Sequence, residues 1–550
     1  MKRFLLVISI AIVGICFSTA HAQFGKKIGD ALKKVEGAVA PASSNNEAAP
    51  ANEATPDENA APANEPAPAN KAAAEKPAPA PAPANKAAAE KPAPAPANEP
   101  APAATASANN STSVVSIGNG NSVGKQATGT ADFYVNSETG SNRNDGSKAA
   151  PFKNLQKAID AAADGATIWV AEGNYFGLLG KGNINITKPL KIYGGYSADF
   201  ANRDILKYMS MVQPTVESNG SQDGQGTMQI QVNSAGSEVV IDGFIFDRGN
   251  SIAYNPKGEG QPEGVASAMM QSIGTKGVGG ANLDIPEVAT AQSSEIYFDN
   301  PSCNITISNC AFINSPNYGI RGNFRDGKAL ITNNIFINNL MSACEIPGTD
   351  VQKNVTIEFS YNTVLFIWSR TRSFEDMGYG YRYMTGADSY VHHNIIGLTC
   401  FSGLDRTRVD SNASKEEQRI TTSEHNIFFL NRQTDLTLPG GGMFLRVKVS
   451  EFDDVEQLDK VAGNKSLTDP NVFKGKINEA YLNGFLTVSY KETANYKPDS
   501  SANEFRRAMG MNQTASIQST TSMFANRYPW KEALVLFGAI NGYGAQTLKN

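Results

Sequence analysis

Histidine, tryptophan and cysteine are scarce in this chain, with 4, 3 and 5 copies among 550 residues. The cysteines contain no C-x-x-C pair, and the histidines do not stand at the spacing from a carboxylate that zinc sites use. So few cysteines in so long a chain also form no disulfide framework. The composition therefore excludes a dense metal-ligand motif and a disulfide scaffold. It identifies no cofactor and leaves any metal site unknown.

Positive charge is not in excess either. The chain has 48 Lys and Arg against 53 Asp and Glu, which gives a formal net charge of −5. Removal of the predicted signal peptide, which contains Lys2 and Arg3, changes the net charge to −7. Proteins that bind nucleic acid draw most of their affinity from a basic surface. We therefore expect no nucleic-acid partner.

Long apolar runs are missing except at the N-terminus. Lys2 and Arg3 precede an apolar core from Phe4 to Phe17, and Ala20-His21-Ala22 forms a small-x-small cleavage site. This pattern predicts a signal peptide over residues 1–22, because the run is too short for a comfortable membrane span; an uncleaved anchor is the alternative. We expect an exported protein, in the periplasm, at the cell surface or secreted, with no transmembrane segment after signal removal.

The five cysteines divide between the leader and the folded part. Cys16 follows Val-Gly-Ile and lacks the small residue that precedes the cysteine of a lipoprotein signal, so we assign it to the apolar core of the leader. Export permits disulfides, but we expect the remaining four to be buried thiols stacked in the core, with one disulfide as the alternative. These four are Cys303, Cys310, Cys344 and Cys400.

The segment after the leader contains little that a core would bury. Residues 23–37 have apolar residues at helical spacing opposite lysines, which predicts a short amphipathic surface helix; a weak contact with a membrane surface or a partner is the alternative. Residues 38–130 are rich in Ala, Pro, Asn and Lys, with a 15-residue repeat that starts at Asn70 and again at Asn85. Ordering such a segment costs entropy that no buried surface offsets, so we predict a disordered, extended linker.

Residues 131–204 begin the folded part as a cap followed by the first coils. A short strand at Phe133 to Val135 leads into an N-D-G turn, and Pro151 to Ala163 has the pattern of an amphipathic helix. A solenoid needs such a cap over its first rung. We expect the helix to cover the N-terminal end of the β-core through its apolar face, which consists of Phe152, Leu155, Ala158, Ile159 and Ala162.

Short β-segments repeat from residue 205 to residue 435. One position recurs in each, first as Cys310 and then as asparagine, at separations of 24, 28, 32 and 32 residues. A rung of three short strands and three turns needs about 20 residues or slightly more, so this spacing predicts one β-helix coil per repeat. Stacked asparagines at an inward bend can bond the turn backbone and each other. We predict a structural ladder of Asn334, Asn362, Asn394 and Asn426.

Two histidines directly precede ladder residues. His393-Asn394 and His425-Asn426 repeat the same dipeptide on successive coils. We assign these dipeptides a structural role and not a catalytic one, because they recur at the coil spacing of the ladder asparagines.

Two segments lack the strand period and are predicted to be insertions. Residues 250–294 are Gly-rich and form a long loop or flap, and residues 368–388 interrupt the coils a second time. Beyond residue 435 the coil pattern weakens. We expect C-terminal coils and a cap over residues 436–550, with a terminal turn at 468–475 and residues 501–550 over the open C-terminal rung.

The stretch PFKNLQKAIDAAADGATIWVAEGNY at 151–175, with the IYGGYS…RD return that ends at Asp204, resembles the right-handed parallel β-helix superfamily of pectate-lyase-like proteins, and within it exported bacterial β-helix proteins. The resemblance covers residues 131–430. It implies an all-β, right-handed parallel β-helix solenoid with an N-terminal capping helix. That superfamily includes polysaccharide lyases, hydrolases and non-catalytic surface proteins, so the fold does not choose a function.

Elimination from a uronate polysaccharide needs a base for the α-proton and positive charge for the developing enolate. The resemblance implies an arginine or lysine base and acidic residues that hold calcium, although no lyase motif matches this chain residue by residue. Spacing alone places several charged residues on successive rungs, where stacking would gather them on one lateral face. These are Arg321, Arg325, Glu345, Asp350 and Glu358.

Residues 368–383 combine arginines, acids and aromatic residues at a density that is unusual for a loop. Aromatic faces stack on sugars, and guanidinium groups bind carboxylates. We predict that this segment lines a lateral cleft and that Trp368, Arg370, Arg372, Glu375 and Arg382 face solvent. The predicted catalytic residues are Arg321, Arg370 and Arg372, and the predicted substrate contacts are Trp368, Glu375, Asp376, Tyr379, Tyr381 and Arg382.

Each of these residues also has a structural explanation. Charged residues on solenoid turns are often solvated or paired, and the aromatic residues could cap the core. The leading hypothesis is an exported β-helix protein that engages an extracellular polysaccharide or cell-envelope glycan. If the protein is an enzyme, this hypothesis makes it a polysaccharide lyase. The alternative is a non-catalytic cell-envelope or adhesion β-helix protein. The sequence leaves enzymatic activity and oligomeric state open.

Overall fold

The computed structural model describes the chain from residue 130 to residue 548, with several gaps. The predicted signal peptide, the 23–37 helix, the linker up to residue 129 and the 250–294 insertion up to residue 293 lie outside the described residues. The gaps after residue 130 are 178–183, 214–229, 248–293, 316–317, 351, 369–377, 410–418, 441–442, 490–497 and 512–527.

The described strands form three sheets, which we call sheets A, B and C. Sheet A consists of β1 (Phe133–Val135), β2 (Thr167–Ala171), β5 (Leu190–Tyr196), β8 (Ala235–Asp242), β11 (Ser302–Ser308), β14 (Gly327–Thr332), β17 (Val355–Ser360), β20 (Ala387–His392), β23 (Thr421–Glu424) and β27 (Lys460–Ala462). Sheet B consists of β3 (Gly173–Tyr175), β6 (Ser210–Val212), β9 (Phe244–Asp247), β12 (Ala311–Ile313), β15 (Ile335–Ile337), β18 (Thr363–Ile367), β21 (Ile395–Thr399), β24 (Ile427–Phe429) and β28 (Lys465–Ser466). Sheet C consists of β4 (Ile184–Ile186), β7 (Ile230–Val232), β10 (Ile296–Asp299), β13 (Tyr318–Asn323), β16 (Ser342–Glu345), β19 (Tyr379–Met384), β22 (Ser402–Arg408), β25 (Thr434–Gly440) and β26 (Met443–Val447).

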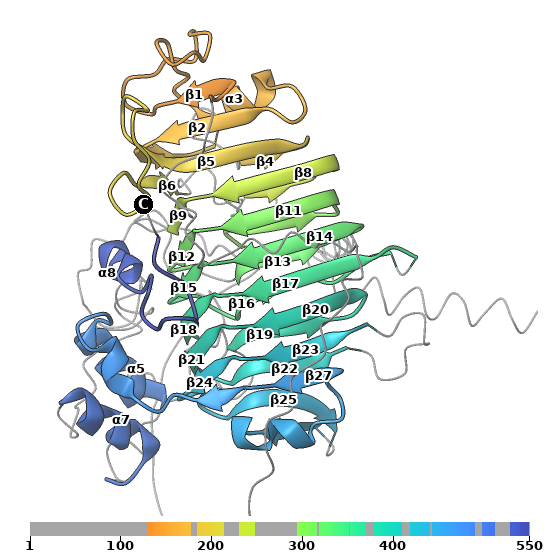
Figure 1. Ribbon diagram of the computed structural model, residues 1–550, viewed down its shortest axis with the longest axis vertical. Coiled ribbons are helices and arrows are strands. Elements are labelled where there is room, and N and C mark those ends of the chain that lie inside the picture. Colours follow the sequence, from red (N-terminus) through yellow and green to blue (C-terminus); the bar gives the residue numbers. More distant parts are fainter. Residues whose placement is uncertain are drawn as a thin grey trace, which may run out of the picture. The chain divides into compact units, whose positions relative to one another are not determined.

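Each coil contributes one strand to each sheet, in the order A, B, C. Thus β14, β15 and β16 make one coil, and β17, β18 and β19 pair with them as the next coil. These pairings are parallel, whereas the terminal β25–β26 hairpin is antiparallel. Figure 1 shows the coils stacked in chain order, from orange at β1 to blue at β25. The predicted parallel β-helix solenoid is confirmed.

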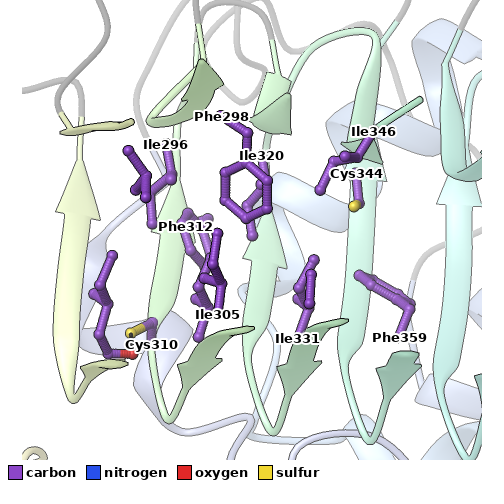
Figure 2. Close-up of a cluster of buried hydrophobic side chains, with 14 of the residues drawn as sticks. Ile296, Phe298, Ile305, Cys310, Phe312, Ile320, Ile331, Cys344, Ile346 and Phe359 are labelled. Atoms are coloured by element: carbon purple, nitrogen blue, oxygen red, sulfur yellow. Dashed lines mark hydrogen bonds between the residues drawn. The ribbon is translucent and has the colours of Figure 1, made fainter. Parts of the chain in front are cut away.

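The interior of the coils is filled by stacked apolar residues. The rings of Phe246, Phe312 and Phe336 lie on successive coils, with neighbouring centroids 4.9 and 4.6 Å apart and planes within 6° of parallel. Figure 2 shows part of this core, with Ile331 and Phe359 among the buried side chains. Similar residues stack because neighbouring strands of a parallel sheet lie about 4.8 Å apart, so equivalent positions meet face to face.

The four cysteines of the folded part are buried free thiols, as predicted, and none forms a disulfide. Three of them lie in the interior cluster of the coils, whereas Cys400 lies in the apolar cluster outside sheet B. Burial raises the pKa of Cys303 to about 11 and that of Cys310 to about 12. These thiols therefore act as core residues and stay protonated at neutral pH.

The asparagine ladder is present as predicted. The backbone N–H of Cys310 donates to the side-chain oxygen of Asn334 at 2.9 Å, and the N–H of Asn334 donates to Asn362 at 3.0 Å. Asn394 and Asn426 continue the same bond on later coils, at 2.8 and 2.9 Å. Each side chain is buried, so the ladder satisfies turn backbone groups that water cannot reach.

A left-handed residue precedes each ladder position. Asn333, Tyr361, His393 and His425 have φ values of 56°, 52°, 56° and 52°. This conformation turns the chain sharply from sheet A to sheet B within two residues. The two histidines of the H-N dipeptides therefore occupy defined turn positions.

The capping helix α3 (Leu155–Ala161) is shorter than the predicted 151–163 helix. Asn154 ends the extended chain as its N-cap, and its side chain accepts a hydrogen bond from the N–H of Gln156. Leu155, Ala158 and Ile159 are buried in the same core cluster as Ile184 of the first coils. The helix thus covers the beginning of the interior.

The C-terminal part closes the coils in two ways. The 3-10 helix η2 (Val449–Asp454) places Phe452 in the interior cluster, with its ring 5.3 Å from that of Phe428. The later helices instead pack on the outer, apolar face of sheet B (Figure 1). They are η3 (Pro470–Phe473), α5 (Glu479–Ser489), α7 (Ser501–Met509) and α8 (Trp530–Leu534).

The expectation that residues 501–550 cover the last rung is therefore wrong for the helices described in that range. Tyr528, just before α8, donates its N–H to Asn314, and Ala545 donates to the hydroxyl of Thr363, which lies on the sheet B side of the coils. The outward residues of sheet B are apolar and needed a cover along their length, which explains the difference. Within the described ranges, no helix has the length and apolar character needed to cross a bilayer.

Candidate functional site

The outer face of sheet C carries a repeated tetrapeptide on four successive coils. Each copy has Tyr or Ser first, then Gly or Ala, then a buried apolar residue, then a charged residue. Tyrosine accompanies arginine and serine accompanies an acid, in strict alternation. The copies are YGIR at 318–321, SACE at 342–345, YGYR at 379–382 and SGLD at 402–405.

The charged residues of these copies form one row. Parallel pairing aligns Arg321 with Glu345, Glu345 with Arg382, and Arg382 with Asp405. The apolar residue before each faces the interior, so the charged residue faces outward because strand side chains alternate. The row therefore alternates in sign along the stack, at one residue per coil.

Arg382 binds both of its acidic neighbours. Its Nη1 donates to Oε2 of Glu345 and its Nε donates to Oδ2 of Asp405, both at 2.8 Å. All three are buried, with Arg382 5% and Asp405 0% exposed. Although burial opposes its charge, the two carboxylates hold the pKa of Arg382 above its ordinary value. Arg382 is therefore a permanent cation locked in place and cannot serve as a proton-abstracting base.

Tyrosine rings support the arginines of this row. The guanidinium carbon of Arg321 lies 4.5 Å from the ring centroid of Tyr318, and that of Arg382 lies 4.4 Å from Tyr379. Arg446 on β26 continues the pattern over Phe401 at 5.8 Å. Such contacts orient a guanidinium and leave its edge available for anions.

Arg321 differs from Arg382 in its partners. It is half-buried, and it makes no ion pair with any residue that the structure describes. Tyr297 precedes it in the row, and Gln231 lies one coil earlier, where its side-chain amide donates to Asp299 at 2.7 Å. The described 318–405 row contains two arginines, and Arg321 is the one whose charge no carboxylate neutralises.

The predicted site residues divide among three places. Trp368 and Arg382 do not face solvent, which contradicts the expectation for both. Trp368 is 0% exposed, donates its Nε1–H to Asn338 at 2.8 Å and packs against Phe485 of α5. An indole enclosed in this way has no face for a sugar. Arg370, Arg372, Glu375 and Asp376 lie outside the described residues.

The described residues that follow the gap at 369–377 belong to the coils and not to an insertion, which corrects that part of the predicted 368–388 segment. Residues 379–384 form β19 in sheet C, and residue 387 begins β20 in sheet A. Tyr381 points inward and its hydroxyl donates to Ser389 at 3.0 Å, while Tyr379 is 4% exposed. The tyrosine–arginine alternation that suggested a ligand-binding loop is the in–out pattern of a strand.

Three other predicted residues lie away from the row. Glu358 is on sheet A, where its carboxylate contacts Lys328 at 2.5 Å, so it does not share a face with Glu345. Arg325 and Asp350 are in turns after sheet C strands, and Asp350 accepts a hydrogen bond from the N–H of Gln352. Asp405 is a further charged residue of the row that was not predicted, although its SGLD copy repeats the spacing of SACE.

Comparisons with known proteins match one family model and several solved structures. Residues 138–356 match a family described as a protein of unknown function (DUF1565). Among curated proteins, none matches the chain. The chain is similar to the solved structure of pectin methylesterase PemA from Erwinia chrysanthemi, with 10% identity, 62% of this chain and 94% of that chain covered, and a TM-score of 0.29. It is also similar to a pectin methylesterase in complex with a hexasaccharide, with 11% identity, the same two coverages and a TM-score of 0.23.

Proposed function

We propose that this chain, whose stacked parallel coils resemble the right-handed parallel β-helix, pectate-lyase-like superfamily, is an exported protein that binds an acidic extracellular polysaccharide along the outer face of sheet C. The observation that carries the proposal is the state of Arg321. Its guanidinium is supported by Tyr318 and has no carboxylate partner among the described residues.

A uronate carboxylate is the ligand that this arrangement fits. Guanidinium binds carboxylate through two parallel hydrogen bonds, and a tyrosine ring beneath it leaves those donors free. The row from Arg321 to Arg446 carries three positive and two negative side chains, a surplus of one positive charge in a chain whose net charge is −5. A polyanion is therefore attracted to this face more than to the chain as a whole.

Cleavage is a narrower hypothesis than binding. The base of an elimination must lose its proton, and the two carboxylates on Arg382 oppose that loss. This leaves Arg321, Arg370 and Arg372 as the predicted bases. The alternative of a non-catalytic envelope or adhesion protein is favoured by the internal pairing of Glu345, Arg382 and Asp405, which is also what a purely structural row would show.

Titration with a panel of polysaccharides tests the proposal. We expect the purified protein to bind polyuronates and to bind neutral glucans and galactans at least about tenfold more weakly, since one charge-assisted pair contributes roughly 1.5–3 kcal/mol. Absorbance of new unsaturated bonds in the same samples separates cleavage from binding. Equal binding to charged and neutral polymers, or no binding to any, contradicts the proposal.

A further inference from the structure

The two adjacent histidines at the end of β20 bring their ring nitrogens together. Nδ1 of His392 lies 3.1 Å from Nδ1 of His393. Consecutive side chains of a strand point to opposite faces, but His393 has a φ of 56°, which ends the strand and brings its side chain beside that of His392. The turn of the ladder thus creates a pair of nitrogen donors.

The ring of His393 is held between two neighbours on adjacent coils. It stacks on Tyr361 with centroids 4.8 Å apart and planes at 14°, and it lies 5.1 Å from the ring of His425. Its backbone oxygen accepts a hydrogen bond from Gly544 at 2.7 Å. The orientation of the ring is therefore set before any ligand arrives.

The ring of His392 is oriented by a carboxylate. Its Nε2 lies 3.5 Å from Oε1 of Glu358, whose other oxygen contacts Lys328 at 2.5 Å. A carboxylate beside Nε2 favours the tautomer with its proton on Nε2, which leaves the lone pair of Nδ1 directed at His393. This is the outer-sphere arrangement that accompanies histidine ligands of metals.

The distance between the two nitrogens fits a metal ion. With metal–nitrogen bonds of about 2.0–2.1 Å, a separation of 3.1 Å corresponds to an angle of about 100° at the metal, between the square-planar and tetrahedral values. We propose that His392 and His393 bind one late first-row divalent metal ion, Cu²⁺ most tightly, through their Nδ1 atoms.

The site is open on its outer side. The side chains of His392 and Glu358 are 26% and 21% exposed, so an ion and its waters can enter. Glu424, the nearest acid in the same row, is held by Lys460 at 2.7 Å. Within the described part of the chain, no group of three His, Cys, Asp or Glu could hold a metal ion. Water therefore completes the coordination, and copper is favoured because it binds imidazole more tightly than the other divalent ions of its row.

Copper titration of the untagged full chain tests the site. We expect one Cu²⁺ per chain at this site, and an electron paramagnetic resonance spectrum with coupling to two nitrogens. Single His392→Gln and His393→Gln variants should each weaken the binding about tenfold or more and remove one nitrogen coupling. His425→Gln is the matched histidine control: it removes a ring that packs beside His393 but that is not a metal ligand in this proposal, so both nitrogen couplings should remain.

Two further variants test whether Glu358 acts as a positioning residue for His392. Glu358→Gln should weaken Cu²⁺ binding about tenfold, because Nε2 loses its carboxylate. Lys328→Met removes the other partner of that carboxylate and should leave copper affinity within about threefold of the wild type. Circular dichroism confirms that each variant is folded. If the His392→Gln, His393→Gln double variant binds Cu²⁺ as tightly as the wild type with the same couplings, the pair is only a hydrogen bond between two rings and the proposal is wrong.

Discussion

Arg321 lies over the ring of Tyr318, with its guanidinium carbon 4.5 Å from the ring centroid, on the outer face of sheet C. The same relationship recurs at Arg382 and Tyr379 two coils later. The two arginines nevertheless differ, because Arg382 is enclosed by two carboxylates whereas Arg321 has no ion-pair partner among the described residues. One repeated local structure therefore supports a structural ion cluster at one coil and an available cation at another.

Removing the charge of Arg382 should destabilise the fold. Arg382→Met leaves the carboxylates of Glu345 and Asp405 buried without their cation, which costs about 3–5 kcal/mol. Chemical denaturation followed by circular dichroism measures the loss. Arg321→Met is the matched control and should cost less than about 1 kcal/mol, because that arginine makes no buried pair. Equal losses in the two variants would show that the buried cluster contributes nothing of its own.

The ladder asparagines should each contribute measurably to stability. Asn362→Leu leaves the N–H of Asn334 without its acceptor and should lower the free energy of unfolding by about 1–3 kcal/mol. Asn354, an exposed residue shortly before β17, is the control, and Asn354→Leu should change stability by no more than about 0.5 kcal/mol. A thermal or denaturant midpoint for Asn362→Leu that matches the control would contradict the role assigned to the ladder.

Glu295 should make the fold less stable as pH rises. It is 1% exposed, and apart from a weak contact with the backbone of Ile313 neither carboxylate oxygen has a hydrogen-bond partner. Burial, and next to it the negative charge of Asp247, raise the pKa of Glu295 well above its ordinary value. In the unfolded chain this carboxyl ionises at about pH 4.3. Above that pH the folded state holds one more proton than the unfolded state, so the free energy of unfolding falls until the folded pKa is passed.

The Glu295→Gln variant tests this sign. It removes the ionisation, so it should gain stability relative to the wild type as pH rises from 5 to 7. Urea unfolding at several pH values measures the difference. Glu456→Gln changes an exposed residue and is the control. Its free energy of unfolding should change with pH in the same way as that of the wild type. If the free energy of unfolding depends on pH in the same way for the wild type and for Glu295→Gln, Glu295 is not a neutral buried acid.

The fold could be predicted from the sequence where one residue type recurs at one place in each coil. The asparagines from Asn334 to Asn426 set the coil length, and the apolar face of the 151–163 segment marked the cap. Placement on a particular sheet was harder, because each coil has three outward faces and a shift of a few residues moves a side chain between them. Glu345 and Glu358 seemed equivalent by spacing, yet they lie on sheets C and A.

The site was predicted only in part for a related reason. The density of charge and aromatic residues at 368–383 drew attention to Arg382, but its burial depends on Glu345 and Asp405, which are 37 and 23 residues away. Trp368 is covered by α5, more than 100 residues later in the chain, so its burial depends on a contact that no local pattern encodes. The alternation of YGIR, SACE, YGYR and SGLD was visible in the sequence and would have identified Asp405.

The affinity of an Arg321 variant for polyuronate tests the central claim most directly. Arg321→Gln should weaken binding of a uronate oligosaccharide at least about tenfold with an unchanged melting temperature, because the charge-assisted bonds to the carboxylate are lost. Arg325→Gln removes the same charge from an exposed residue of the following turn and should leave the affinity within about threefold of the wild type. If the two variants bind equally well, the outer face of sheet C around Arg321 is not the polysaccharide site.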